Sequence, residues 1–393
     1  MAKRFMELIE ARGRADLEKT ICSSCVSDAA LVQAVKNLGG AETCSYCEEA
    51  PTSPVASAPM EVVLELVVDG FRHEYEDPVE QMAWDDGYVG KVYDTWDLIW
   101  ELDVSERSDV QEDIVNAIQQ DQWCQRNPYA ATPAEALTWG WAAFRKFVKH
   151  RRRFTFLVRD HSTAEGAGEI PMHAMPAAIA DAVADAGLIE PHAGDNEWWR
   201  VRVHAGGESY SSAADLGTPP DKLARDNRMS PKGIGAFYGA STQKGARDEV
   251  GGYAEPDEEG SVGLFRTVVP FDIVDLRELP AVPSLFDADR RHLRAPIQFL
   301  HAFVEDATKI ADPSDTHDLD YVPTQVVAET FRYELAGNNG PVAGVLWRSS
   351  RDPSVTSCVL FIPSDEVADK GRETDRTRLV LDPATVGHIT APL

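Results

Sequence analysis

The stretch "NRMSPKGIGAFYGASTQKGARDEV", residues 227–250, contains the signals of a turn, a strand and a helix in succession. Arg228 precedes "PKG", and a proline and a glycine this close together are typical of a turn. "GAFYGA" is apolar and aromatic, so it predicts a short strand ending at Tyr238. "TQKGARDEV" then predicts a helix, which places Glu249 eleven residues after Tyr238. The glycines belong to the turn and the strand, because neither a Walker motif nor a Rossmann fingerprint occurs here.

Outside this stretch, the sequence from residue 197 onward changes between short strands and helices. Period-two patterns and short apolar runs predict strands in "WRVRV", "GLFRTVVPFDIVDL", "AGVLWRSS" and "CVLFI". Helical patterns lie between them at 242–250, 288–310 and 323–336. Because no regular strand–helix–strand repeat is present, this part of the sequence predicts an α+β domain.

Polar side chains occur on the faces and at the ends of these predicted strands. Two arginines of "WWRVRV" are two residues apart, so they share one face of their strand. Each candidate also has a plain structural interpretation: exposed strand arginines, a core or edge tyrosine, a solvated glutamate and turn-forming serines. The side chains that can line one cleft are Arg200 or Arg202, Arg228, Tyr238, Glu249, and Ser349 or Ser350.

The sequence before residue 160 is mostly helical in pattern. "TPAEALTWGWAAFRKFVKH" begins with Thr132 as a helix cap and Pro133 at the first helical position. Its apolar residues recur at helical spacing from Leu137 to Val148 and so predict one buried face. A further helix is predicted in "MPAAIADAVADAGLIE", ending at Gly187.

Four of the six cysteines form two pairs near the start of the chain. Cys22 and Cys25 read "CSSC", Cys44 and Cys47 read "CSYC", and 18 residues separate the pairs. This is the spacing of two knuckles that hold one tetrahedral zinc ion, with no open position for catalysis. Two disulfides or a redox site are the alternatives. The absence of an export signal argues against the disulfides, and a redox site would need only one CxxC pair. The remaining cysteines, Cys124 and Cys358, have apolar neighbours and predict buried thiols.

Composition narrows the classes of function. The formal net charge is −27 and the isoelectric point is about 4.7, so phosphate is repelled over most of the surface and general nucleic-acid binding is not expected. No run of 18 apolar residues is present, so no membrane helix is expected. The first twenty residues read as a charged helix rather than a secretory signal, which predicts a cytoplasmic protein.

The order arginine, arginine, tyrosine, glutamate, serine in this setting resembles the RES domain, which is named for its arginine, glutamate and serine. The matching segments are "WWRVRV", "NRMSPKGIGAFYGASTQKGARDEV", "YVPTQVVAETFR" and "GVLWRSS…VLF". The glutamate segment departs from the usual A-L-A-E-like pattern, because it reads Ala246-Arg247-Asp248-Glu249. RES domains are similar to ADP-ribosyltransferases in fold, and many are bacterial toxins that break down NAD.

This resemblance implies roles for the candidate residues. Glu249 is expected to stabilise an oxocarbenium-like transition state and to hold a ribose hydroxyl. Arg200 and Arg228 are expected to bind the pyrophosphate of NAD. Tyr238 is expected to stack on the nicotinamide, and Ser349 to hydrogen-bond the nicotinamide ribose or amide. The acceptor of the ADP-ribosyl group can be water, phosphate or a protein, and the residues do not choose among them.

The N-terminal half resembles the HEPN-like helical region found before some RES domains. The matching segments are "ICSSCVSD…CSYC", "DGYVGKVYDTWDLI", "DQWCQRNPY" and "FVKHRRRFTF". Arg145 and His150 fit the minimal R-x4-6-H pattern of HEPN ribonucleases, but basic residues at a helix end are also favoured by the helix dipole. A third interpretation is a module that binds nucleic acid or a regulator through residues 149–153.

The expected organisation is therefore a four-cysteine zinc unit and a mainly helical domain, followed by an ADP-ribosyltransferase-like mixed α/β RES domain. The expected partners are NAD and a protein regulator or antitoxin, without a membrane. The predicted boundaries are 1–50 for the zinc unit, 60–160 for the HEPN-like domain and 161–194 for a linker with a connecting helix. The RES domain is predicted at 195–365 and a tail at 366–393.

Overall fold

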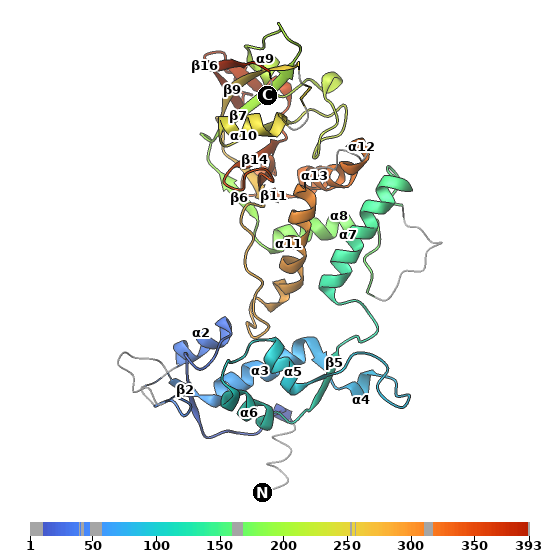
Figure 1. Cartoon of the computed structure of the whole chain (residues 1–393), viewed down its shortest axis with the longest axis vertical. Coiled ribbons are helices and arrows are strands. Elements are labelled where there is room, and N and C mark those ends of the chain that lie inside the picture. The colour runs from blue at the N-terminus through green and yellow to red at the C-terminus, as the bar shows by residue number, and fades with distance from the viewer. Residues whose placement is uncertain are drawn as a thin grey trace. The chain divides into compact units, whose positions relative to one another are not determined.

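The computed structural model divides the chain into two compact units (Figure 1). The first contains the residues up to Ala134 together with Ala281–Ala295, and the second contains the remainder from Glu135 onward apart from Gly168. The structure describes residues 11–38, 40, 43–47, 57–158, 168–251, 254–255, 257–309 and 317–391. The start of the predicted N-terminal helix, at 1–10, lies outside these residues.

The first unit is mainly helical, with two small antiparallel sheets, β1 with β2 and β3-β5-β4. Its elements in chain order are β1 (Thr20–Cys22), α2 (Ala29–Leu38), β2 (Ser57–Pro59), α3 (Met60–Glu74), β3 (Tyr75–Glu76), α4 (Pro78–Gln81), β4 (Tyr93–Asp94), α5 (Thr95–Glu101), α6 (Ser108–Ala117) and β5 (Gln122–Gln125). The helix η2 (Arg291–Leu293) also belongs to it.

One hydrophobic core serves this whole unit. α3 buries residues at helical spacing, among them Leu64, Val67 and Phe71. Cys22 and Cys25 lie in the same core. The structure therefore differs from the predicted separation of a cysteine unit at 1–50 from a helical domain at 60–160.

The second unit joins a nine-stranded sheet to several helices. Its elements are α7 (Pro133–His150), α8 (Met175–Asp185), β6 (Ile189–His192), β7 (Glu197–His204), α9 (Ala213–Leu216), η1 (Asp221–Leu223), β8 (Phe237–Ala240), α10 (Gln243–Val250), β9 (Glu259–Thr267), β10 (Phe271–Asp275), α11 (Arg294–Thr308), α12 (His317–Asp320), α13 (Val322–Glu334), β11 (Ala336–Gly337), β12 (Gly340–Pro341), β13 (Gly344–Arg348), β14 (Thr356–Leu360), η3 (Ser364–Glu366), β15 (Val367–Asp369) and β16 (Leu379–Ile389). α7 and α11 begin at the division between the units.

The strand order is β15-β16-β9-β7-β8-β14-β13-β10-β6. Neighbouring strands are antiparallel except β15 with β16 and β10 with β13, which are parallel. This mixed sheet and the predominantly helical first unit confirm the predicted α+β class. The strands and helices expected from 197 to 362 are present, although β8 begins two residues after the start of "GAFYGA" and continues past the predicted end at Tyr238 to Ala240.

Alternation along β7 and β8 separates two cores. Trp198 and Phe237 lie on one face with the apolar residues of β9, β14 and β16. The next residues, Trp199 and Tyr238, lie on the other face. On that face α8, α11 and α13 cover one end of the sheet, and α10 packs against β7 and β8 at the other end (Figure 1).

The structure also differs from the predicted outer boundaries of this unit. α7 and α8 contribute Phe144, Val148 and Ile179 to the core beneath the sheet, so the connecting helix predicted with a linker at 161–194 is a helix of this core. The segment predicted as a tail, 366–393, forms β15 and β16, and β16 pairs along β9. Charged residues hid these strands: β15 is the edge strand of the sheet, and β16 lies between it and β9.

Candidate functional site

Arg228 lies at the tip of a two-residue turn. Asn227 and Ser230 exchange backbone hydrogen bonds, with N···O distances of 2.9 and 3.3 Å, and this closes the turn. The guanidinium of Arg228 donates to the carbonyl oxygens of Ala307 at 2.7 Å and Lys309 at 2.5 Å. Arg228 therefore binds the carboxyl end of α11, where helix carbonyls lack partners within the helix.

Tyr238 lies on the other side of the same turn. Its hydroxyl accepts a hydrogen bond from the backbone amide of Met229 at 3.2 Å and lies 3.0 Å from Oγ of Ser230. Burial raises the pKa of Tyr238 to about 12, so the phenol is neutral at physiological pH. The structure thus brings Arg228 and Tyr238 together, as two side chains joined through one turn.

Arg200 contacts Tyr238 through the backbone rather than the side chain. Its Nη1 donates to the carbonyl oxygen of Tyr238 at 2.9 Å, and its guanidinium lies 5.1 Å from the ring centroid of Phe237. Arg202, two residues along β7, donates to the carbonyl oxygen of Asp215 and lies over the ring of Tyr210. Arg200 is therefore the arginine of this pair that adjoins β8.

Glu249 and Ser349 lie near the end of the sheet that α10 covers. Glu249 is exposed on α10, and within the described part of the chain its carboxylate makes no hydrogen bond or ion pair. Ser349 is buried just after β13, where its amide donates to the carbonyl of Val355 at 2.9 Å. Val355 belongs to the same small core as the buried side of α10. Ser350, the alternative to Ser349, is exposed.

A shallow hollow lies between this turn and α13. None of the five residues to which the RES resemblance assigns roles is among the described residues that line it: Arg200, Arg228, Tyr238, Glu249 and Ser349. The lining consists of Met229, Ser230, Pro231, Ile234, Ala236, Gln325, Ala328, Glu329, Arg332, Tyr333 and Phe361. The hollow therefore adjoins the turn of Arg228 from the side of α13.

Two polar residues of α13, Thr324 and Gln325, contact the turn and were not singled out as site residues. Both are 7 % exposed. The sequence predicts that "PTQ" caps a helix, with Thr324 structural. The structure places Thr324 within the first turn of α13, where its hydroxyl lies 3.0 Å from the carbonyl of Tyr321 and α13 has no side-chain cap among the described residues. The missed signal is that "TQ" stands on the buried face of a helix whose neighbouring buried residues are apolar, because buried polar groups require partners.

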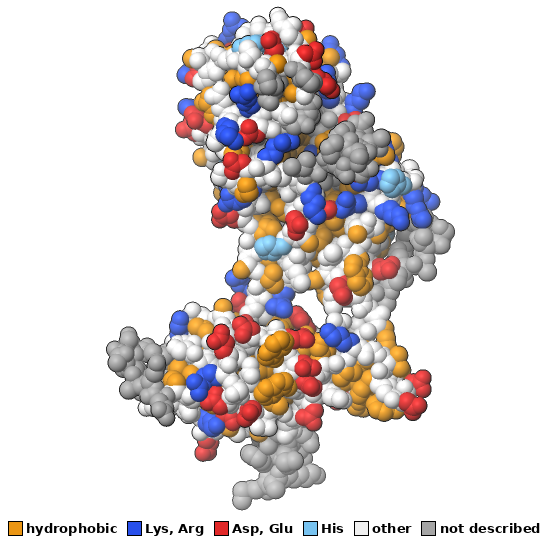
Figure 2. Space-filling model, viewed as in Figure 1, with side chains coloured by type: hydrophobic (Ala, Val, Ile, Leu, Met, Phe, Trp, Pro, Cys, Tyr) orange, Lys and Arg blue, Asp and Glu red, His pale blue; other side chains and the backbone are white. Residues whose placement is uncertain are grey.

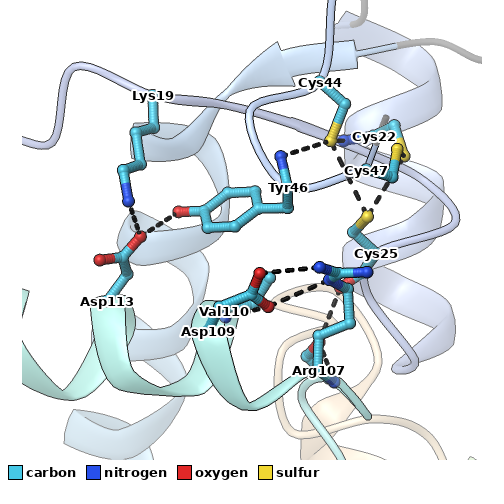
Figure 3. Close-up of polar contacts among 11 residues, drawn as sticks. Lys19, Cys22, Cys25, Cys44, Tyr46, Cys47, Arg107, Asp109, Val110 and Asp113 are labelled. Atoms are coloured by element: carbon cyan, nitrogen blue, oxygen red, sulfur yellow. Dashed lines mark hydrogen bonds and ion pairs between the residues drawn. The ribbon is translucent and has the colours of Figure 1, made fainter. Parts of the chain in front are cut away.

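The cysteine cluster is the clearest site in the first unit (Figure 3). The sulfurs of Cys22 and Cys25 are 3.6 Å apart, those of Cys22 and Cys47 are 3.6 Å apart, and those of Cys25 and Cys44 are 3.8 Å apart. All four sulfurs lie within 4.8 Å of one another. Because a disulfide requires about 2.05 Å, these thiols are not paired in disulfides.

The separations fit a metal centre. Four sulfurs at about 2.3 Å from a tetrahedral zinc ion lie about 3.8 Å from one another. Backbone amides of Cys22 and Tyr46 point at Sγ of Cys44, at 3.3 and 3.4 Å. Burial raises the pKa of the Cys44 thiol, but amides of Tyr46, Cys22 and Cys47 outweigh it and lower the pKa to about 7. These four residues can hold a metal ion as thiolates.

Residues around the cluster fasten its two knuckles to α6. The hydroxyl of Tyr46, between the second pair of cysteines, donates to Asp113 at 2.7 Å, and Lys19 binds the same carboxylate (Figure 3). The hydroxyl of Ser105 donates to the carbonyl of Cys25 at 2.7 Å. Hydrogen bonds thus connect each of the two cysteine knuckles to the helical part of the first unit.

The ribonuclease pattern on α7 is not assembled as a pair. Nη1 of Arg145 lies 2.7 and 2.6 Å from the two carboxylate oxygens of Asp306, which also accepts from Trp141 at 2.9 Å. His150 is exposed, and five residues correspond to about 140° around an α-helix. This geometry favours the structural interpretation of Arg145.

The interpretation of the N-terminal half as a nucleic-acid module is disfavoured by charge. Residues 11–134 contain 24 acidic and 8 basic side chains. Figure 2 shows acidic side chains at many separate places on the visible face of this unit, with fewer basic ones among them. In the predicted basic segment, Lys149 pairs with Asp320, and Arg151, Arg152 and Arg153 are exposed.

Comparison with known families assigns both halves of the chain. The HEPN/RES N-terminal domain 1 matches residues 37–162, and the RES domain matches residues 197–382. No curated protein and no solved structure matches the chain. The chain is a RES-domain protein with a HEPN-like N-terminal region, as its motifs predict. The RES domain indicates an NAD-related enzyme. Among the described residues, every helix is too short or too polar to span a bilayer.

Proposed function

We propose that the RES domain cleaves the bond between nicotinamide and ribose in NAD. The observation that carries this proposal is the RES match at 197–382, which includes in order Arg200, Arg228, Tyr238, Glu249 and Ser349. In this reaction the C1′–N bond breaks, and its electron pair leaves with nicotinamide. An acceptor oxygen from water, phosphate or a protein then forms a bond to C1′ and releases its proton to solvent.

Glu249 is proposed as the catalytic carboxylate. Positive charge develops on the ribose as the bond to nicotinamide lengthens, as in glycoside cleavage. A carboxylate beside C1′ stabilises that charge, and its interaction is strongest in the transition state. The exposed position of Glu249 on α10 leaves its oxygens accessible to a substrate.

The other residues are proposed to orient NAD. Arg200 and Arg228 bind the pyrophosphate, and the two bonds of Arg228 to α11 use only two of its five N–H groups. Tyr238 contributes a ring for stacking on nicotinamide. Ser349 contributes a hydroxyl for the ribose or the amide, and that hydroxyl accepts from Arg351 N at 3.3 Å.

The decisive experiment is incubation of the purified full chain with NAD and quantification of nicotinamide by chromatography, with and without inorganic phosphate. Nicotinamide release supports the proposal, and its absence under every acceptor condition rejects it. ADP-ribose, ADP-ribose 1″-phosphate or a modified protein identifies the acceptor as water, phosphate or protein. Expression of the wild type should deplete cytoplasmic NAD and slow growth, and Glu249→Gln should relieve both effects.

We propose a structural and regulatory role for the first unit. Its four cysteines are proposed to hold one Zn²⁺, since their donors and spacing suit that ion. An enzyme that depletes NAD harms the cell that makes it, so a protein regulator or antitoxin is the proposed partner. Zinc analysis of the purified chain tests the first role, and purification of a stable complex from native cells tests the second.

A further inference from the structure

The turn that carries Arg228 is held by groups from outside it. Its ends, Asn227 and Ser230, already bond to each other through the backbone. That pairing fixes the shape of the turn, but it does not fix the direction in which the turn faces the rest of the domain. α13 supplies that direction through Thr324 and Gln325, which stand side by side in the sequence.

Gln325 places its side-chain amide against the inner carbonyls of the turn. Its Nε2 donates to the carbonyl of Asn227 at 2.9 Å and lies 3.5 Å from that of Ser230. It also lies 3.3 Å from a carboxylate oxygen of Asp226. An amide buried to this extent is costly without partners, so these contacts account for its presence on an otherwise apolar face.

Thr324 holds the tip of the turn. Its hydroxyl has one hydrogen, and the carbonyl of Arg228, at 2.5 Å, is its nearest acceptor. The next backbone group, the amide of Met229, is bound by the hydroxyl of Tyr238. The peptide on the carboxyl side of Arg228 is therefore gripped from α13 on one side and from β8 on the other.

We propose that Thr324 and Gln325 are positioning residues that aim Arg228 at the substrate, an inference that rests on the proposed NAD cleavage. A guanidinium binds two phosphate oxygens well only when its plane and distance are right. Fixing the backbone that bears it removes disorder that binding would otherwise have to overcome. The two residues act through Arg228 and touch neither the reacting bond nor the nicotinamide.

The test uses Thr324→Val and Gln325→Met in the full chain, with nicotinamide release followed as a function of NAD concentration. Each variant should raise KM for NAD by about tenfold, with a smaller change in kcat, because pyrophosphate binding weakens in the ground state and the transition state alike. Thr324→Ser, which keeps the hydroxyl, should restore the wild-type KM. Thr330→Val is the matched control, since Thr330 on the same helix bonds only to the helix carbonyl of Val326 in the described structure.

Coupling to Arg228 separates positioning from general stability. In an Arg228→Ala background, Thr324→Val should produce no further rise in KM, because the group that it aims is absent. An equal rise in both backgrounds, or an unchanged KM in the single variants, would overturn the proposal while leaving NAD cleavage intact. Failure of the wild type to release nicotinamide would instead reject the proposed function, and this inference with it.

Discussion

The cysteine cluster of the first unit and the candidate NAD site of the RES domain are built on opposite principles. The cluster gathers four identical donors from two short segments around one point. The candidate NAD site draws single residues from β7, the Arg228 turn, β8, α10 and the end of β13. Thiolates packed this closely repel one another unless a cation lies among them. The arginines and the tyrosine are held by backbone groups and need no ion.

This difference predicts two kinds of sensitivity. Damage to the cluster should act on folding, because the first unit shares its core with two of the ligands. Damage to the candidate NAD site should act on the reaction, because Glu249 is exposed and Arg200 and Arg228 are only partly buried.

Removal of the metal should have the largest effect. Structural zinc contributes an apparent free energy of about 10–16 kcal/mol in small zinc domains, which exceeds the stability of most domains. Chelation, or Cys22→Ser, should therefore unfold the first unit, as measured by circular dichroism and limited proteolysis. Elemental analysis should find one zinc per chain before treatment.

Cys124→Ala is the control for this experiment. It removes a buried thiol that lies outside the cluster, so the zinc content should not change. Zinc-free wild-type protein with four titratable thiols in its native state would contradict the metal centre.

Glu249→Gln should have the next largest effect, and on turnover alone. Loss of a pre-placed charge should lower kcat by about two to four orders of magnitude, with little change in affinity for NAD. The melting temperature should stay unchanged, because the side chain is exposed. Asp248→Asn removes the neighbouring carboxylate, which pairs with Lys244, and should leave kcat near the wild-type value. Wild-type turnover in Glu249→Gln would show that another group is the catalytic carboxylate.

Asp306→Ala should affect stability and not catalysis. It leaves Arg145 and the indole N–H of Trp141 without their shared acceptor, at a cost of about 1–3 kcal/mol in the free energy of unfolding. His150→Ala should cost nothing measurable, since His150 is exposed. RNA cleavage by the wild type that His150→Ala abolishes would instead revive the ribonuclease interpretation.

The smallest effect concerns acid stability. Burial alone would raise the pKa of Asp275, but hydrogen bonds from Arg277 outweigh it and lower the pKa below the ordinary value. A carboxylate of this kind stabilises the fold above its unfolded pKa, and the contribution is lost as pH falls through the folded pKa. Urea unfolding between pH 6 and pH 3 should therefore show a shallower pH dependence for Asp275→Asn than for the wild type. Parallel curves would show that Asp275 does not contribute to the loss of stability in acid.

The sequence predicts the geometry of the cysteine cluster more directly than it predicts how the candidate NAD residues lie. Each CxxC knuckle places its two sulfurs close together by local geometry, so the spacing of the cysteines is enough to predict that the four sulfurs converge. The candidates of the RES domain are spread over about 150 residues, and their convergence depends on strand order and on which face each residue occupies. The partnership of Gln325 with the Arg228 turn joins residues almost 100 positions apart, which no local pattern encodes.

The predicted domain boundaries also differ from the structure, because they too depend on long-range contacts. Periodicity identified α7 and α8 as helices, but it could not state which core they join. The charged residues of β15 and β16 resemble those of a solvated tail until strand pairing is known. Such assignments depend on long-range contacts, which a single sequence carries only indirectly.

The segment Ala281–Ala295 has a consequence for how this protein can be inherited. It lies within the RES match, yet Leu285 and Phe286 pack in the core of the first unit. The chain therefore leaves the second unit after Pro280 and re-enters it at Pro296. Recombination at a single point between the two family regions would produce two descendants. One would have the core of the first unit without this segment, and the other would have Leu285 and Phe286 without the core in which they pack. The two regions are thus expected to pass between genomes as one heritable block rather than as separable modules.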